Sequence, residues 1–167
     1  MSDTELTAPH HLTVGYVGRP GERTFYLQAE DAQARLSVQL EKGQVDGIGD
    51  LLTQLLARIG ESPATEVDRG SFELRVPVDA QWRVREVGVG IDDAEAHLLL
   101  ELAGVTETGE PASARIWFDR GHARRLATHA SRIVAEGRPR CRLCDRPTAA
   151  DGDHVCPSTN GHGPLGR

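Results

Sequence analysis

Residues 34–60 read ARLSVQLEKGQVDGIGDLLTQLLARIG, and this stretch changes its hydrophobic period partway along. Over 34–41 apolar and polar residues alternate, which predicts a half-buried strand. From Val45 onward the apolar residues recur at spacings of three and four, which predicts an amphipathic helix over 43–59 that ends at Gly60. The apolar face of that helix comprises Val45, Ile48, Leu52, Leu55 and Ile59.

A second stretch repeats this transition 78 residues later. ARIWFDRGHA (114–123) aligns with LSVQLEKGQV (36–45), so that Glu41-Lys42-Gly43-Gln44 corresponds to Asp119-Arg120-Gly121-His122. One interpretation is an internal duplication of a βββα unit. The alternative is that any strand leading into a helix favours an acidic N-cap near a glycine.

The remaining elements complete two such units. We expect further strands over 11–18, 24–30, 71–78, 82–91, 95–105 and 114–119. A second helix follows residue 119, with apolar positions from Ala123 to Val134, and Gly137 and Pro139 stop it. We expect residues 1–10, which are mostly polar, to be frayed.

Each helix and each set of strands has one apolar face that it must bury against another element. The sequence therefore predicts an α+β fold, mainly an antiparallel sheet with two packed helices. The expected organisation is an α+β domain over 1–137, with the two repeats at 11–60 and 71–137, and a small tail over 138–167.

Composition excludes several protein classes. The chain has 167 residues and a formal net charge of −6, which argues against general binding to nucleic acid or anionic membranes. No apolar run approaches the roughly 20 residues that a membrane span needs. The first residues do not resemble a signal peptide, so we expect a cytoplasmic protein.

All three cysteines lie in the stretch CRLCDRPTAADGDHVCP (141–157). The spacing of Cys141 and Cys144 is typical of a metal-binding turn, and Cys156 is far enough along for the loop to return and close the site. A structural zinc ion takes four ligands, and His154 is the favoured fourth, with His162 as the alternative.

Two other interpretations of the cysteines stay open, namely thiols without a metal and a Cys141–Cys144 redox pair. A redox pair usually precedes a helix in a thioredoxin-like βαβ unit, whereas this motif follows a helix. Beyond residue 138 the chain has few apolar side chains, so we expect a bound ion to supply the folding free energy of the tail. Four protein ligands leave no open position for catalysis.

Other polar residues indicate a function less clearly than the cysteines do. Four arginines flank the cysteines and either contact phosphates or form a solvated surface; they are Arg138, Arg140, Arg142 and Arg146. His122 and His129 are seven apart, which does not match the usual spacing of a helical ligand pair, and we expect both on the surface. We expect His10 and His11 in the frayed N-terminus. No catalytic constellation is evident.

Three stretches together resemble an actinobacterial family that carries a domain of unknown function. They are VGRPGERTFYLQAE (17–30), VQLEKGQV (38–45) and the tail from Gly137 to His162. The cysteines and His154 match the family's tail pattern, although Asp145 and Asp153 replace its usual glycines. The resemblance supports His154 as fourth ligand and implies a bacterial cytoplasmic protein with no established enzyme activity.

The sequence thus leads to three hypotheses of different classes. The first is a non-enzymatic protein with a structural zinc site that acts through a protein partner. The second is an enzyme or small-ligand binder with a cleft between the two βββα repeats. The third is nucleic-acid contact through the arginines around the cysteines.

Overall fold

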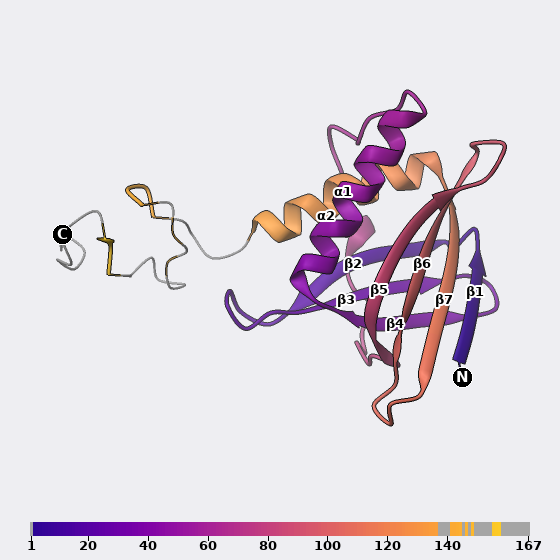
Figure 1. Cartoon of the computed structure of the whole chain (residues 1–167), viewed down its shortest axis with the longest axis horizontal. Helices are drawn as coiled ribbons and strands as arrows, with labels where there is room; N and C mark the ends of the chain where they lie inside the picture. The colour runs from indigo at the N-terminus through magenta and orange to yellow at the C-terminus, as the bar shows by residue number, and fades with distance from the viewer. Residues whose placement is uncertain (1, 137–140, 145, 147, 149–154, 158–167) are drawn as a thin grey trace.

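The computed structural model describes residues 2–136, 141–144, 146, 148 and 155–157 (Figure 1). One mixed sheet of seven strands has the order β1-β7-β6-β5-β4-β3-β2, and two α-helices pack on it. The strands are β1 (Ser2–Thr7), β2 (His11–Val17), β3 (Thr24–Glu30), β4 (Arg35–Leu40), β5 (Trp82–Ile91), β6 (His97–Val105) and β7 (Pro111–Asp119). The helices are α1 (Lys42–Arg58) and α2 (Arg120–Ala135). The predicted α+β class is confirmed.

The chain runs through two consecutive βββα units, β2-β3-β4-α1 and β5-β6-β7-α2. Within each unit the strands form an antiparallel meander. The units meet where β4 runs parallel to β5, through only the pairs Val38–Trp82 and Gln39–Arg83. Figure 1 shows the two meanders crossing at a steep angle. A common origin of the two units stays a prediction.

Both strand-to-helix junctions are capped, through different hydrogen bonds. Glu41 and Asp119, which the alignment of the two stretches paired, are the N-caps of α1 and α2. The amide of Glu41 donates to Oε1 of Gln44 at 2.8 Å, and the carboxylate of Asp119 accepts from the amide of His122 at 2.7 Å. Each junction thereby satisfies a backbone N–H that lacks a partner within the helix.

The predicted end of α1 at Gly60 is also confirmed. Gly60 has a φ of +74°, which glycine adopts without steric cost. The amides of Gly60 and Glu61 donate to the carbonyls of Ala57 and Leu56, which is the pattern of a Schellman motif.

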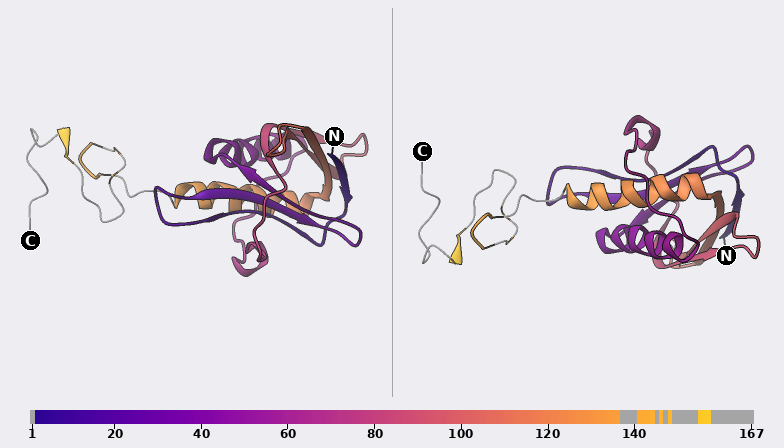
Figure 2. Two further views of the ribbon diagram at one scale, coloured as in Figure 1. Left: turned by 90° about the horizontal axis from the view of Figure 1, so that it is seen from below. Right: turned by 90° about the horizontal axis from the view of Figure 1, so that it is seen from above.

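Both helices lie side by side on one face of the curved sheet (Figure 2). They approach closely at Gly49, where an added Cβ would lie 3.1 Å from Oγ of Ser131 and 3.4 Å from Cβ of Ala130. Leucines and isoleucines from both units fill the space between helices and sheet, and burying each stabilises the fold by roughly 1.5–3 kcal/mol. The largest fully buried side chains include Leu27, Leu36, Ile48, Leu52, Leu98, Leu100, Ile116 and Phe118.

The predicted strand over 71–78 is wrong. Gly70–Phe72 is a short 3-10 helix, and an irregular segment follows it. Side chains of the first meander satisfy this backbone: Thr13 donates to the carbonyl of Phe72 at 2.7 Å, and the amide group of Gln28 bonds to both the N–H and the C=O of Arg75. The segment therefore pairs with side chains rather than with a neighbouring strand.

The predicted fraying of residues 1–10 is wrong as well. Ser2–Thr7 forms β1, which pairs in parallel with β7 at the edge of the sheet. Leu6 is fully buried, and the hydroxyl of Ser113 donates to Asp3 at 2.5 Å. The remaining side chains of β1 are mostly exposed, so this strand lacks the hydrophobic alternation that predicts one.

Candidate metal centre

The three cysteines come together in the structure. The Sγ atoms of Cys141, Cys144 and Cys156 all lie within 4.8 Å of one another, and those of Cys141 and Cys156 are 3.7 Å apart. Cys156 is buried, whereas the other two are partly exposed. Within the part of the chain that the structure describes, this is the one group of three or more histidines, cysteines or acids placed to share an ion.

Backbone hydrogen bonds organise the first two cysteines. The amide of Cys141 donates to the carbonyl of Arg146 at 2.9 Å, which closes a turn around the CxxC pair. The amide of Leu143 points at Sγ of Cys141 at 3.4 Å. Together with the amide of Cys144, it lowers the pKa of the Cys141 thiol, because amide donors stabilise a thiolate. The turn is therefore built to hold negative charge on sulfur.

The thiol of Cys144 behaves differently. The amide of Arg146 favours its thiolate, but burial and the neighbouring sulfurs of Cys156 and Cys141 outweigh that amide and raise the pKa of Cys144. Three clustered sulfurs repel one another when they ionise, and a cation among them removes that penalty. The donor set thus fits a thiophilic metal.

The sulfur spacing fits a tetrahedral metal ion with thiolate ligands, of which zinc is one. A tetrahedral ion with Zn–S bonds of about 2.3 Å places its ligands about 3.8 Å apart, which the Cys141–Cys156 distance matches. A disulfide would require about 2.05 Å. His154 and His162, the predicted fourth ligands, lie outside the described residues, as do Arg138 and Arg140.

The histidines of α2 do not lie free on the surface as the spacing suggested. His122 Nε2 and His129 Nε2 each lie 2.8 Å from a backbone carbonyl of β2, those of Leu12 and Val14 respectively. His129 is only 5% exposed, and Phe72 stacks on its ring with centroids 4.6 Å apart. These two histidines are structural, because they form hydrogen bonds with backbone carbonyls at the free edge of β2, the outermost strand.

The other histidines among the described residues, His10, His11 and His97, belong to no group placed to share an ion. His11 lies at the start of β2 and is buried, and burial, with the nearby charge of Arg75, lowers its pKa. His10 and His97 are exposed beside acids, at 3.7 Å from Glu30 and 3.1 Å from Asp92. The placement of His11 in a frayed terminus is therefore wrong.

A cleft of about 470 Å³ lies between β2, the irregular segment after Val67 and the end of α2. The hypothesis of a cleft between the two repeats named none of its residues. Polar side chains that line it include Tyr16, Arg69, Arg132 and Glu136. They come from three separate parts of the chain and share no motif, so no local pattern could have identified them.

No helix among the described residues is both long and apolar enough to cross a membrane. No curated protein and no solved structure matches the chain. One family model, described as "Protein of unknown function (DUF3090)", matches residues 4–156, a span that begins in β1 and ends on the third cysteine. The sheet, both helices and all three clustered thiols thus lie within a single family match, and the chain belongs to the DUF3090 family of proteins of unknown function.

Proposed function

We propose that this protein carries a structural zinc ion on Cys141, Cys144, Cys156 and one histidine, and that the tail so folded contacts a protein partner. The convergence of the three sulfurs, with a 3.7 Å separation suited to a tetrahedral ion, is the observation that carries the metal assignment. A site with four protein ligands has no open position, so the ion organises the chain and takes no part in a reaction.

Two considerations favour His154 as the fourth ligand over His162. His154 precedes Cys156 by two residues, in the half of the loop that returns to the CxxC turn. The family match also includes His154 and ends before His162. The imidazole of His154 completes the tetrahedron in this proposal.

The position of the hydrophobic core supports a structural role for zinc. Among the described residues, those that form or pack against the core extend from Leu6 to Val134, and none lies beyond α2. Leu143 and Val155 in the tail are 66% and 73% exposed. Among the described tail residues these two apolar side chains bury little surface, whereas zinc coordination supplies free energy of the required size.

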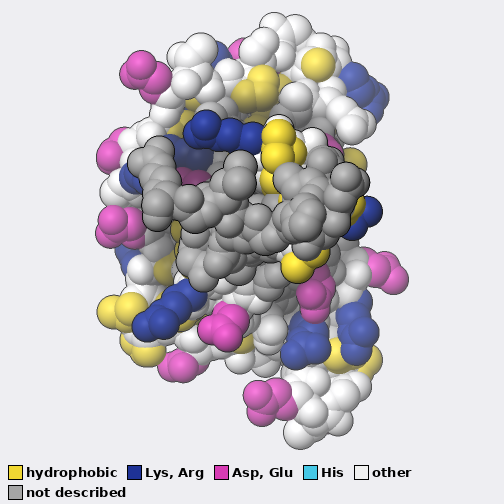
Figure 3. All heavy atoms as spheres, turned by 90° about the vertical axis from the view of Figure 1, so that its left-hand side faces the viewer, with side chains coloured by type: hydrophobic (Ala, Val, Ile, Leu, Met, Phe, Trp, Pro, Cys, Tyr) yellow, Lys and Arg dark blue, Asp and Glu magenta, His cyan; other side chains and the backbone are white. Residues whose placement is uncertain are grey.

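We place the protein in the cytoplasm with a protein partner, because reduced thiols that bind zinc fit a reducing compartment. The exposed Leu143 and Val155 are apolar side chains that a partner would cover. Nucleic acid is the less suitable partner, because lysine and arginine side chains mix with acidic ones on the face in Figure 3 and the net charge is −6.

Metal analysis of the purified full-length protein tests the assignment. We expect about one zinc per chain in the wild type and in His162→Ala, and substoichiometric zinc in Cys144→Ser and His154→Ala. Absence of metal from wild-type protein, with all three thiols open to alkylation, would refute the zinc site. The partner proposal fails separately if zinc-loaded protein and Cys144→Ser retain the same proteins from the native cell. It also fails if the protein forms a salt-sensitive complex with nucleic acid that Arg142→Ala abolishes.

A further inference from the structure

We infer that the cleft beside the end of α2 is a binding site for a small organic anion with an apolar body. This site is separate from the three cysteines and lies between elements of the two βββα units. Its volume of about 470 Å³ falls within the range of small-molecule sites, roughly 300–1,000 Å³. The two ends of the cleft differ in their chemistry.

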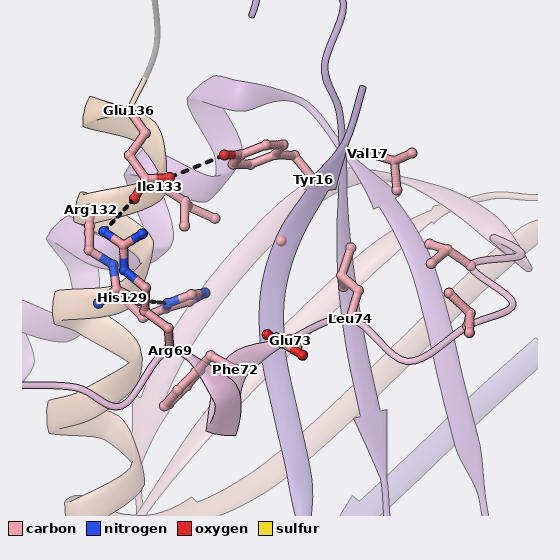
Figure 4. A pocket seen from close by; sticks show the side chains of 13 residues that line it. Tyr16, Val17, Arg69, Phe72, Glu73, Leu74, His129, Arg132, Ile133 and Glu136 are labelled. Atoms are coloured by element: carbon pink, nitrogen blue, oxygen red, sulfur yellow. Dashed lines mark hydrogen bonds and ion pairs between the residues drawn. The ribbon is translucent and has the colours of Figure 1, made fainter. Parts of the chain in front are cut away.

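The polar end gathers guanidinium groups around one carboxylate (Figure 4). Arg69 Nη2 lies 3.3 Å from Oε1 of Glu136, and the hydroxyl of Tyr16 donates to Oε2 of Glu136 at 3.1 Å. Arg23 donates to the backbone carbonyl of Glu136 at 2.7 Å, and its guanidinium lies 3.9 Å from the centroid of the Tyr16 ring. Both carboxylate oxygens of Glu136 thus already face donors.

Arg132 adds a third guanidinium, which the protein holds in place. Its Nη2 donates to Nδ1 of His129 at 2.9 Å, and its Nη1 donates to the carbonyl of Val67 at 3.3 Å. The Nε atoms of Arg132 and Arg23 are buried and donate to none of the described residues. Of these two arginines only Arg132 lines the cleft, so its guanidinium is the one that a ligand in the cleft would contact.

The charges of this end favour an anion. Arg69 and Arg132 line the cleft, and Arg23, which does not line it, contacts the lining residues Tyr16 and Glu136. Together these three arginines outnumber the two carboxylates of the cleft, Glu73 and Glu136. Guanidinium forks bind carboxylates and phosphates through paired, charge-assisted hydrogen bonds. In the free protein Glu136 occupies the position that the anionic group of a ligand would take.

The other end of the cleft is apolar. Leu74 packs directly on Gly15 of β2. A Cβ added to Gly15 would lie only 2.6 Å from the Cγ atom of Leu74. The absence of a side chain at Gly15 therefore allows the segment to lie close against the strand. Val17 lies on this side as well, away from Glu136 (Figure 4), and Val76 and Val78 also line the cleft. Val76 is 83% exposed in the free protein, and a ligand's apolar body would cover it.

Four compounds with the same eight-carbon chain test the inference by calorimetry on full-length, zinc-loaded protein. Octanoate and octyl phosphate present the two anionic head groups, octan-1-ol presents a neutral one and octylammonium a cation. We expect the anions to bind and the alcohol and the cation to bind at least about tenfold more weakly, since a charged hydrogen-bond donor contributes that much. The tighter of the two anions identifies the head-group class.

Two substitutions in the cleft have opposite expected effects. Arg69→Gln, at a side chain that is 74% exposed, should weaken anion binding by about tenfold without unfolding the protein. Glu136→Gln should strengthen it severalfold, because it removes the carboxylate that competes for the same donors. Arg58→Gln is the matched control, because Arg58 is exposed at the end of α1. This variant should bind the anions as tightly as the wild type does.

The inference is overturned if neither anion binds, or if the anions bind no more tightly than octan-1-ol. It is equally overturned if Arg69→Gln and Arg58→Gln have the same affinity, or if Glu136→Gln weakens binding. None of these outcomes depends on zinc stoichiometry, so failure of this inference and failure of the zinc assignment are distinguishable.

Discussion

The Nε2 atom of His129 lies 2.8 Å from the carbonyl oxygen of Val14, and the same imidazole accepts a hydrogen bond from Arg132 through Nδ1. Because a carbonyl can only accept, Nε2 carries the proton and Nδ1 does not. The imidazole is therefore neutral, and burial, with a smaller effect of Arg132, lowers its pKa. One side chain thus joins the edge of the sheet, α2 and the cleft.

Replacement of His129 should destabilise the protein substantially. His129→Ala leaves the Val14 carbonyl without its donor and removes the stacking on Phe72, so we expect a loss of about 2–4 kcal/mol in the free energy of unfolding. Urea unfolding followed by circular dichroism measures it. His97→Ala, at an exposed position, is the control and should change stability by less than about 0.5 kcal/mol.

Stability should also fall on mild acidification. Burial lowers the pKa values of His11, His122 and His129 in the folded state, so the unfolded chain binds more protons below a pH of about 6.5. The stabilisation is complete above that pH and is lost as the pH falls toward the folded-state pKa values. Each histidine contributes at most about 1.4 kcal/mol per pH unit.

Histidines and carboxylates lose their contributions to stability in different pH ranges. The pKa values of Glu30, Asp31, Asp68 and Asp92 are lowered mainly by hydrogen bonds, so their contribution is lost only below their usual pKa values near 4. Unfolding free energies measured between pH 6.5 and 5 should therefore report the histidines. A His129→Gln variant should show a shallower slope there, and a slope equal to that of the wild type would contradict the assignment.

The strand-to-helix junctions and the cysteine cluster were predictable because each depends on residues close together in sequence. A change of period from two to 3.6 marked both junctions, and the spacing of Cys141 and Cys144 indicated that the cysteines cluster. The roles of His122 and His129 were not predictable. These histidines are seven residues apart on α2, and they contact carbonyls that are two residues apart on β2. This pairing depends on how α2 lies along the edge of the sheet, which the sequence does not specify.

The two errors in strand assignment have different physical causes. The segment over 71–78 alternates like a strand, but Pro77 lacks an N–H, and the side chains of Thr13 and Gln28 satisfy the neighbouring backbone instead. In β1 only Leu6 faces the core, so tertiary pairing with β7 outweighs a weak local pattern.

The cap of α2 provides a local test of the junction. Asp119→Ala should lower the free energy of unfolding by about 1 kcal/mol, because the amide of His122 loses its acceptor. Asp119→Asn is the matched control and should retain nearly full stability, since asparagine caps helices as well as aspartate does. Equal losses in both variants would show that charge rather than capping matters at this position.

Two glycines of α1 should respond in opposite ways to substitution. Gly49→Leu should cost about 1–3 kcal/mol, because the new side chain meets Ala130 and Ser131 of α2 at the helix crossing. Gly47→Ala should stabilise the protein by about 0.5–1 kcal/mol, because an added Cβ has no atom within 4 Å and alanine favours the helix. Thermal unfolding of both variants measures the difference, and destabilisation by Gly47→Ala would show that α1 packs differently.

Removal of the metal should affect only the tail. The core extends no further than Val134 among the described residues, so a strong chelator should leave the free energy of unfolding of the sheet and helices unchanged within about 0.5 kcal/mol. The chain beyond α2 should then become sensitive to protease, as it should in Cys144→Ser without chelator. Limited proteolysis with mass spectrometry, beside circular dichroism of the same samples, measures both effects. Cooperative loss of the whole fold on chelation would mean that the zinc-bound tail packs into the core, and an unchanged cleavage pattern would mean that the tail folds without an ion.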